Sequence, residues 1–195
     1  MRAQDFWDSQ APTFDDEPDH GLQDPTVQTA WANLLLPQIP PPPGSVIDLG
    51  CGTGSLAVLL AQAGHTVQGL DLSPRMIAAA KAKATNLHLD VDFQQGDAST
   101  PPFPPASCDV VLARHVLWAL PDPATALHHW TRLLRPGGKL VLIEGRWSTG
   151  SGLTASECQA LVLTHRREAT VRHLDDPALW GKPVDDERYL LISPA

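Results

Sequence analysis

Cysteine is scarce in this sequence, and the few cysteines present are not spaced for metal binding or cross-linking. Cys51, Cys108 and Cys158 form an odd set, and none of them belongs to a C-x-x-C motif. We therefore expect neither a disulfide framework nor a structural zinc site. Unpaired thiols are typical of a reducing compartment, so we expect the protein to be cytoplasmic.

Long apolar runs and long basic runs are also missing. The first ten residues, MRAQDFWDSQ, are not apolar, and no window approaches the roughly 18 consecutive apolar residues of a membrane helix. We expect no signal peptide and no membrane span. The chain has 14 basic and 22 acidic residues, a net charge of −8, and its longest Lys/Arg run is Arg166–Arg167. Nucleic-acid binding needs a basic stripe, so a small-molecule partner is the better expectation.

The length and composition are those of an ordinary globular domain. The 195 residues are 43% hydrophobic and 18% charged, which argues against disorder and coiled coil. This length predicts one domain over residues 1–195, without room for a separate substrate domain. Proline is unusually frequent, with 19 residues, and its clusters at 40–43 and 101–105 predict stiff connections.

Residues 1–45 are predicted to form an arm followed by a helix. Residues 1–23 are polar and acidic with scattered Phe6, Trp7 and Phe14, which we expect of an irregular arm lying over another part of the chain. Asp24 and Pro25 are typical of a helix N-cap and first turn, and apolar residues continue at helical spacing until Pro37.

The remaining residues alternate between strand-like and helical segments. Predicted strands cover residues 46–49, 66–70, 88–94, 109–113 and 139–144, and predicted helices cover 56–63, 74–84 and 123–134, the last two behind the N-caps Ser73 and Asp122. The segment 146–195 adds a helix from the capping box Thr154/Glu157 to about Arg167, then two strands at 170–174 and 188–192, joined without a helix.

This order of elements predicts an α/β fold. We expect a doubly wound, Rossmann-like sheet of seven strands, mostly parallel, with an antiparallel edge strand and helices on both faces. Residues 46–145 would form its ligand-binding core. Ligands of such sheets bind beyond the carboxyl ends of the strands.

The strongest local signal is VIDLGCGTGSLA at residues 46–57, where a strand turns into a helix. Gly50, Gly52 and Gly54 permit a tight turn and the close approach of a ligand to the backbone. Dinucleotide folds prefer G-x-G-x-x-G, but the third glycine of that motif is replaced here by Ser55. Asp48 precedes the loop and would repel a pyrophosphate, whereas a cationic ligand would be attracted.

Acidic residues follow three successive strands. Asp71 ends the second strand, where a carboxylate can accept hydrogen bonds from both hydroxyls of a ribose, and Asp97 follows the third. Asp71 has an alternative interpretation as the start of an Asx turn before Ser73. Because these strand ends meet at one rim, we expect Asp48, Asp71 and Asp97 to face one crevice.

Five segments in this order resemble the class I S-adenosylmethionine-dependent methyltransferases. They are VIDLGCGTG, GLDLSPRMI, FQQGDA, CDVVLARHVLWALPDP and LLRPGGKLVLIEG, and the resemblance extends from about Trp7 to the C-terminus. It implies S-adenosyl-L-methionine as the cofactor and methyl transfer to O, N or C of a small molecule. The acceptor itself cannot be read from these residues, and neither can the oligomeric state.

The resemblance also implies a cofactor site. Asp48, Gly50, Cys51, Gly52 and Gly54 would surround the methionine part, Asp71 would bind the ribose, Leu72 and Met76 would pack on adenine, Asp97 and Ala98 would contact the adenine edge, and Arg114 would lie near the amino acid moiety. Two alternatives stay open. Met76 could be ordinary helix core, and Arg114 could form a surface ion pair.

Methyl transfer from a sulfonium needs alignment and desolvation rather than a nucleophilic side chain. A general base would assist some acceptors, and His115, after the fourth strand, and His20, in the arm, are the candidates. Packing, backbone hydrogen bonding and substrate contact are the alternatives for both. No metal is indicated, since His128 and His129 are adjacent on a helix and point apart.

Tryptophans are the candidates for the acceptor pocket. Trp118 and Trp180 could form an apolar wall, and Trp7 and Phe14 could close the arm over the cofactor, although core packing is the alternative for each. Two rival functions remain. One is a nicotinamide-dependent dehydrogenase, which Ser55 and Asp48 disfavour; the other is a non-catalytic cofactor-binding module.

Overall fold

The computed structural model describes residues 2–194 and contains one mixed sheet of seven strands. The strands are β1 (Ser45–Leu49), β2 (Thr66–Asp71), β3 (Asp92–Gln95), β4 (Cys108–Arg114), β5 (Leu134–Arg146), β6 (Thr170–His173) and β7 (Glu187–Ser193), in the order β3-β2-β1-β4-β5-β7-β6. Strands β1 to β5 pair with one another in parallel, and β7 runs antiparallel to both β5 and β6. The predicted sheet, with its antiparallel pair at one edge, is confirmed.

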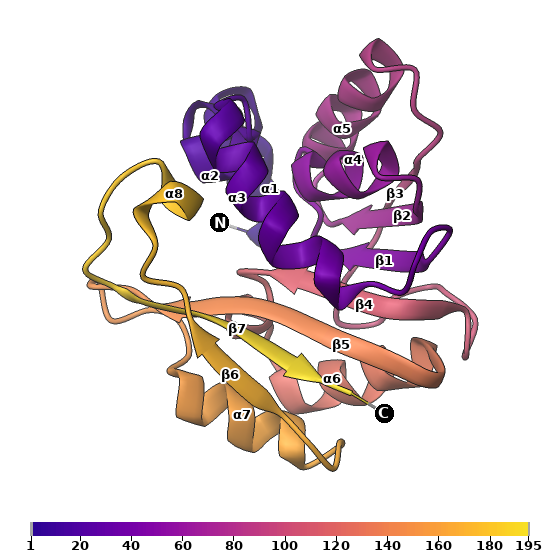
Figure 1. Cartoon of the computed structure of the whole chain (residues 1–195), viewed down its shortest axis with the longest axis vertical. Coiled ribbons are helices and arrows are strands. Elements are labelled where there is room, and N and C mark those ends of the chain that lie inside the picture. The colour runs from indigo at the N-terminus through magenta and orange to yellow at the C-terminus, as the bar shows by residue number, and fades with distance from the viewer. Residues whose placement is uncertain (1, 195) are drawn as a thin grey trace.

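Helices cover both faces of this sheet, as expected. Figure 1 shows α3 (Pro25–Leu35), α4 (Ser55–Gln62) and α5 (Pro74–Asn86) on one face and α6 (Pro123–Leu133) and α7 (Ala155–Leu163) on the other. Each face has its own apolar core. Trp31 and Leu60 are fully buried on the first face, and Trp130 and Leu140 on the second. The strand order reverses between β1 and β4, which is where ligands of doubly wound sheets bind.

The predicted N-caps are all present and set where four helices begin. Asp24 accepts from the Thr26 N–H at 2.7 Å, Ser73 from Met76 at 3.1 Å and Asp122 from Thr125 at 3.0 Å. The capping box is complete, since Thr154 and Glu157 each accept from the backbone N–H of the other. Because these contacts are local, they could be read from short sequence segments.

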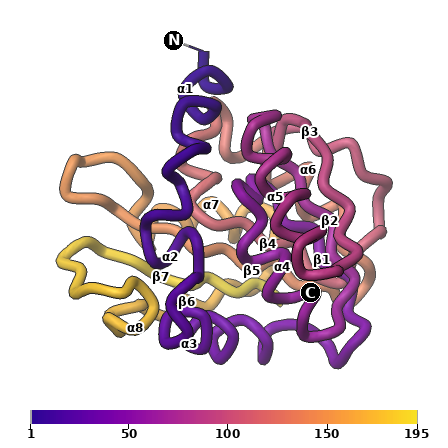
Figure 2. The backbone as a smooth tube through the Cα atoms, turned by 90° about the horizontal axis from the view of Figure 1, so that it is seen from above, coloured from indigo at the N-terminus to yellow at the C-terminus, as the bar shows by residue number. Residues whose placement is uncertain are grey.

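The N-terminal arm is helical, so the prediction of an irregular segment is wrong. It consists of α1 (Ala3–Gln10), the short 3-10 helix η1 (Ala11–Asp16) and α2 (Pro18–Gly21). No residue of α1 is buried, and a hydrogen bond of 2.5 Å from Ser73 Oγ to Asp8 docks this helix on α5. Figure 2 shows the arm crossing between the α4–α5 side of the molecule and the α8 side. The helices of the arm are stabilised by contacts with distant segments, and the apolar pattern of the arm's own sequence does not reveal these contacts.

Three further boundaries differ from the prediction. Strand β3 begins only at Asp92, because the chain turns at His88 (φ 55°) while it leaves α5. Helix α7 ends at Leu163 instead of about Arg167, since the Arg166 guanidinium turns to the Gly138 carbonyl at 3.0 Å. The last two strands are joined through a one-turn helix, α8 (Pro177–Trp180).

The structure also bears on whether a helix could span a membrane. Over residues 2–194, no helix combines the length and the apolar character needed to cross a bilayer.

Candidate functional site

A cavity of about 530 Å³ opens beyond the carboxyl ends of β1, β2 and β4. The arm, the segment after β4 and the loop between α8 and β7 close it. Its walls include Trp7, Phe14, Glu17, Asp19, His20, Asp48, Gly50, Cys51, Gly52, Asp71, Leu72, Met76, Asp97, Ala98, Arg114, His115, Trp118, Trp147, Lys182 and Arg188. The volume is typical of a site for a small organic ligand. All but one of the predicted cofactor residues therefore meet in one place.

The glycine loop forms the floor of this cavity. The N–H groups of Gly50 and Cys51 both donate to the Leu70 carbonyl, at 2.7 and 2.9 Å, which turns the chain sharply after β1. Gly50 has φ 70°, and a Cβ there would lie 2.3 Å from Val116 Cγ2. Only glycine fits this position, because both the backbone conformation and the space exclude a side chain.

Gly54 is the predicted cofactor residue that lies outside the cavity lining. A Cβ at this position would lie 2.7 Å from Phe93 Cζ and 2.9 Å from Ala80 Cβ. Gly54 therefore lets α4 begin close against β3 and α5. Gly54 thus serves packing, whereas Gly50 and Gly52 shape the cavity.

Asp71 forms the Asx turn that was its alternative interpretation, and it also lines the cavity, where ribose binding stays a prediction. Its Oδ1 accepts from the Ser73 N–H at 2.8 Å, which is the Asx turn, and its Oδ2 accepts from the Gly52 N–H at 2.9 Å. The residue also lines the cavity. Burial raises the pKa of the Asp71 carboxyl, and these two backbone hydrogen bonds oppose that rise. Each oxygen keeps lone pairs for a ligand.

Asp48 and Asp97 complete an acidic end of the cavity together with Asp71. Asp48 is buried, and burial raises the pKa of its carboxyl to about 7, against the opposing effect of Arg114. Asp97 accepts from the Ser99 N–H at 2.8 Å, and the neighbouring Ala98 carbonyl accepts from Trp130. Three carboxylates around one hollow favour a ligand with positive charge.

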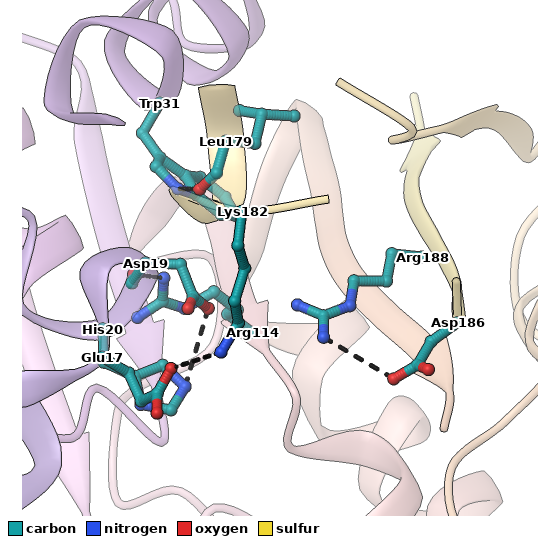
Figure 3. A network of polar contacts seen from close by, with 9 residues as sticks. All are labelled: Glu17, Asp19, His20, Trp31, Arg114, Leu179, Lys182, Asp186 and Arg188. Carbon is teal, nitrogen blue, oxygen red and sulfur yellow. Dashed lines mark hydrogen bonds and ion pairs between the residues drawn. The ribbon is translucent and has the colours of Figure 1, made fainter. Parts of the chain in front are cut away.

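Arg114 ends β4 and joins the arm to the sheet. Its guanidinium donates to the Asp19 carbonyl and lies 5.1 Å from the Trp31 ring centroid (Figure 3). Burial lowers the pKa of Arg114, while the Asp19 and Asp48 carboxylates raise it. The alternative of a surface ion pair does not hold, because these contacts lie under the arm.

The arm lies directly over the glycine loop. The Phe14 ring is the nearest neighbour of Gly52, and it stacks on the His20 ring with centroids 4.3 Å apart. Asp15 anchors the arm by accepting from Thr53 Oγ1 at 2.5 Å and by an ion pair of 2.9 Å with Lys83. Trp7 and Phe14 line the cavity, as predicted for a closing arm.

His115 turns the chain out of β4 and lines the cavity. It has φ 59°, an uncommon conformation for a non-glycine residue that often marks a functional position. Its Nδ1 is buried without a hydrogen-bond partner in the described part of the chain. Burial, with the charge of Arg114, holds the pKa of His115 well below its usual range, so the imidazole is neutral at pH 7. Burial also lowers the pKa of His20, which lines the same cavity.

A basic and aromatic end of the cavity is formed by Trp118, Trp147, Lys182 and Arg188. The rings of Trp118 and Trp147 lie 5.1 Å apart, and the Trp118 indole donates to the His115 carbonyl at 3.0 Å. Lys182 pairs with Glu17 of the arm at 2.8 Å, and the Arg188 guanidinium lies 3.6 Å from Asp186 (Figure 3).

Sequence reasoning missed Glu17, Trp147, Lys182 and Arg188, which come from the arm and the C-terminal segment. Arg188 carried a signal, because a charged residue opens the otherwise apolar strand RYLLIS. Trp180 was predicted at this site, but it is fully buried in the core, where it donates to the Leu174 carbonyl at 2.9 Å and packs on Trp31. That prediction is wrong.

Glu144 is another buried carboxyl near the site. Its Oε1 accepts from the Val116 and Leu117 N–H groups at 3.0 and 2.7 Å, which fixes the segment that carries Trp118. Burial raises the pKa of Glu144 to about 8. Within residues 2–194, no cluster of three or more His, Cys, Asp or Glu side chains could hold a metal ion.

Comparisons with known proteins agree with this geometry. A family profile described as a methyltransferase domain matches residues 47–142. Demethylmenaquinone methyltransferase of Thermus thermophilus is 38% identical over 104 residues, 52% of this chain and 47% of that protein. Ubiquinone biosynthesis O-methyltransferase of Xanthomonas campestris pv. campestris is 30% identical over 141 residues, 72% of this chain and 56% of that protein. The chain thus spans about half the length of these curated relatives.

A likeness to solved structures extends further along the chain. The cyclase SpnF superposes with a TM-score of 0.73 at 21% identity, over 85% of this chain and 79% of that one. At this identity the likeness shows the fold alone, so the reaction has to be argued from the cavity.

Proposed function

The chain belongs to the methyltransferase domain family through residues 47–142, and we propose that it transfers a methyl group from S-adenosyl-L-methionine to an oxygen, nitrogen or carbon of a small-molecule acceptor. The observation that carries this proposal is the acidic end of the cavity. Asp48, Asp71 and Asp97 face a hollow beside a glycine loop, which fits a ligand with a sulfonium and an ammonium group and would repel a pyrophosphate.

The residues present fit this cofactor. Asp71 would accept from the ribose hydroxyls through the lone pairs that its two backbone hydrogen bonds leave open. Asp97 and the Ala98 backbone would contact the adenine edge, with Leu72 and Met76 against the ring. Asp48, Gly50, Cys51, Gly52 and Arg114 would surround the methionine part. Met76 is 1% exposed and lines the cavity, so core packing and cofactor contact are compatible.

The bound cofactor supplies an activated methyl group on a good leaving group. The chain's own contribution is to align the acceptor and to exclude water, which the arm does by covering the cavity. A proton released by a hydroxyl or amine acceptor would pass to His115 or His20, and both are neutral acceptors near pH 7 because burial lowers their pKa.

Thermal-shift titration separates this proposal from a dehydrogenase. We expect S-adenosylhomocysteine to raise the melting temperature and NADH to leave it unchanged, since the carboxylates favour a cation. Stabilisation by NADH alone would refute the proposal. Turnover of S-adenosyl-L-methionine on an acceptor panel then distinguishes an enzyme from a non-catalytic binding module.

The cellular setting belongs to the same proposal. Cys51, Cys108 and Cys158 are all free and buried, which supports a reducing compartment such as the cytoplasm. The net charge of −8 supports a small-molecule acceptor over nucleic acid. The oligomeric state is left open.

A further inference from the structure

The basic and aromatic end of the cavity has the chemistry of an acceptor site. It lines the same cavity as the acidic end, where the proposed function places the cofactor, so the inference rests on that function. Its walls are the tryptophans Trp118 and Trp147 and the cations Lys182 and Arg188. An acceptor bound here would contact both the tryptophan rings and the cationic side chains.

The aromatic wall favours a planar molecule. Trp118 and Trp147 are half-buried, and their ring centroids lie 5.1 Å apart with an interplanar angle of 54°. Ala119, Leu120 and Pro121 continue the same wall. Because the Trp118 N–H is already bonded to the His115 carbonyl, this side chain has only its apolar ring surface to offer a ligand.

Arg188 supplies a hydrogen-bond donor without a partner at this wall. Its guanidinium lies over the Trp180 ring, 4.3 Å from the centroid, and the residue, from β7, is part of the cavity lining. Figure 3 shows the guanidinium beside Asp186. The Arg188 Nε is buried without a partner in residues 2–194, and the contact of the guanidinium with Asp186 is 3.6 Å, longer than a hydrogen bond. A buried donor without an acceptor is costly, and the fork of guanidinium N–H groups matches a carboxylate.

Lys182, the other cation of this end, already has a carboxylate partner and is exposed. It pairs with Glu17 at 2.8 Å, and both side chains are more than half exposed, at 54% and 53%. An ammonium held by a nearby carboxylate in solvent adds little binding of its own. Arg188 has an ion pair of 3.6 Å with Asp186, but unlike Lys182 it is largely buried and has no hydrogen bond to a carboxylate in residues 2–194, so it is the cation of this end better suited to an added anion.

We propose that the acceptor is a small aromatic acid, with its ring along Trp118 and Trp147 and its carboxylate bound by Arg188. The cavity volume of about 530 Å³ has to hold the cofactor as well, which restricts the acceptor to a small molecule. In a chain with a net charge of −8, a dedicated guanidinium is needed to hold an anion.

Calorimetry on the full chain saturated with S-adenosylhomocysteine tests this assignment. The probes are 4-hydroxybenzoate, 3,4-dihydroxybenzoate, indole-3-acetate, the neutral 4-hydroxybenzamide and phenyl phosphate. We expect at least one of the carboxylates to bind, and the amide to bind about tenfold more weakly than 4-hydroxybenzoate because it lacks the charge. This comparison uses the wild-type protein and needs no variant to fold.

Variants then locate the anion. Arg188→Gln should weaken carboxylate binding about tenfold, and Arg188→Lys should weaken it less, because it keeps the charge without the fork. The matched control is Arg172→Gln, on the neighbouring strand β6, where the side chain is exposed and outside the cavity lining. This control should leave all affinities unchanged.

The outcomes separate this inference from the proposed function. Failure of S-adenosylhomocysteine to bind the wild type overturns both. Normal S-adenosylhomocysteine binding with no carboxylate bound, equal affinity for the amide, or unchanged affinity in a folded Arg188→Gln variant overturns the acceptor assignment alone. Tighter binding of phenyl phosphate than of every carboxylate would also overturn it, in favour of a phosphorylated acceptor.

Discussion

Each end of the cavity has a carboxylate that accepts hydrogen bonds from two backbone N–H groups, but the two carboxylates have different roles. At the acidic end, Asp71 accepts from two backbone N–H groups, of Gly52 and Ser73. Near the basic end, Glu144 accepts from the N–H groups of Val116 and Leu117. Asp71 also faces the cavity, whereas Glu144 lies behind its wall, and its Oε2 is buried without a partner in the described chain.

This difference shows that the depth of burial decides whether a carboxylate can contact a ligand or only stabilise the wall of the cavity. Asp71 remains available to a ligand at the rim, so its carboxylate can be part of the proposed cofactor site. Glu144 has no access to a ligand, and burial raises its pKa to about 8. A carboxyl in that position holds the wall in place through its hydrogen bonds. Its protonation therefore affects the free energy of unfolding.

The largest expected effect is at the acidic end. Asp71→Ala removes the carboxylate proposed to bind the ribose and should weaken S-adenosylhomocysteine binding about 100-fold, the effect of two charge-assisted hydrogen bonds. Calorimetry measures this, with Asp92→Ala as the control, since Asp92 lies on β3 outside the cavity lining. Unchanged affinity in Asp71→Ala would contradict the ribose assignment.

The next effect is on stability behind the basic end. Between about 4.5 and about 8, folded Glu144 keeps a proton that the unfolded chain releases, so its contribution to stability is complete below this window and is lost as the pH rises through it. Glu144→Gln keeps an oxygen for Val116 and Leu117 and has no proton to lose.

The free energy of unfolding of Glu144→Gln should therefore gain on the wild type by about 2 kcal/mol between about pH 5 and pH 6.5, and the gain should level off above about pH 8. Urea unfolding at several pH values measures it. Parallel stability curves for the two proteins would mean that Glu144 is ionised in the folded state throughout.

A smaller effect returns to the acidic end. Burial raises the pKa of Asp48 to about 7 in the free protein, and a cationic ligand favours its ionised form. The affinity for S-adenosylhomocysteine, which carries an ammonium group, should rise by up to about tenfold per pH unit below 7 and then become constant. Asp48→Asn should flatten this profile; if it retains the wild-type slope, another group is responsible.

The smallest effect concerns the ion pair between the arm and the basic end. Glu17 and Lys182 are exposed, so Glu17→Gln should lower the free energy of unfolding by less than about 1 kcal/mol. The loss should vanish in high salt, because exposed pairs are screened. Unfolding measured at low and high ionic strength checks this, and a larger loss that persists in salt would show that Glu17 packs as well as pairs.

Local signals explain which parts of the acidic end could be predicted. The Asx turn of Asp71 and the caps Ser73 and Asp122 depend on neighbours two or three residues away. Their roles in the fold can be read from a short segment, because turn geometry and helix ends are local properties. The strand pattern then brings these segments to one rim.

The basic end depends on contacts between distant segments and could not be predicted in the same way. Lys182 meets Glu17 of the arm from a distant part of the chain, Arg188 is placed by the pairing of β7 with β5, and Trp180 lies in the core because α8 docks against α3. The spacing of a tryptophan relative to other apolar residues is the same whether its side chain lies in the core or in the wall of a pocket. The helical arm was missed for a related reason, since α1 has no buried side chain that would give it a pattern.

The anchors of the arm have a consequence for the timing of each turnover. Asp8 holds Ser73, and Asp15 holds Thr53 and Lys83, beside the glycine loop. A spent cofactor would have to wait for these contacts to open, a motion of microseconds to milliseconds that is slow beside bond making. We expect a burst of methylated product in the first turnover, followed by a slower steady rate set by the departure of S-adenosylhomocysteine.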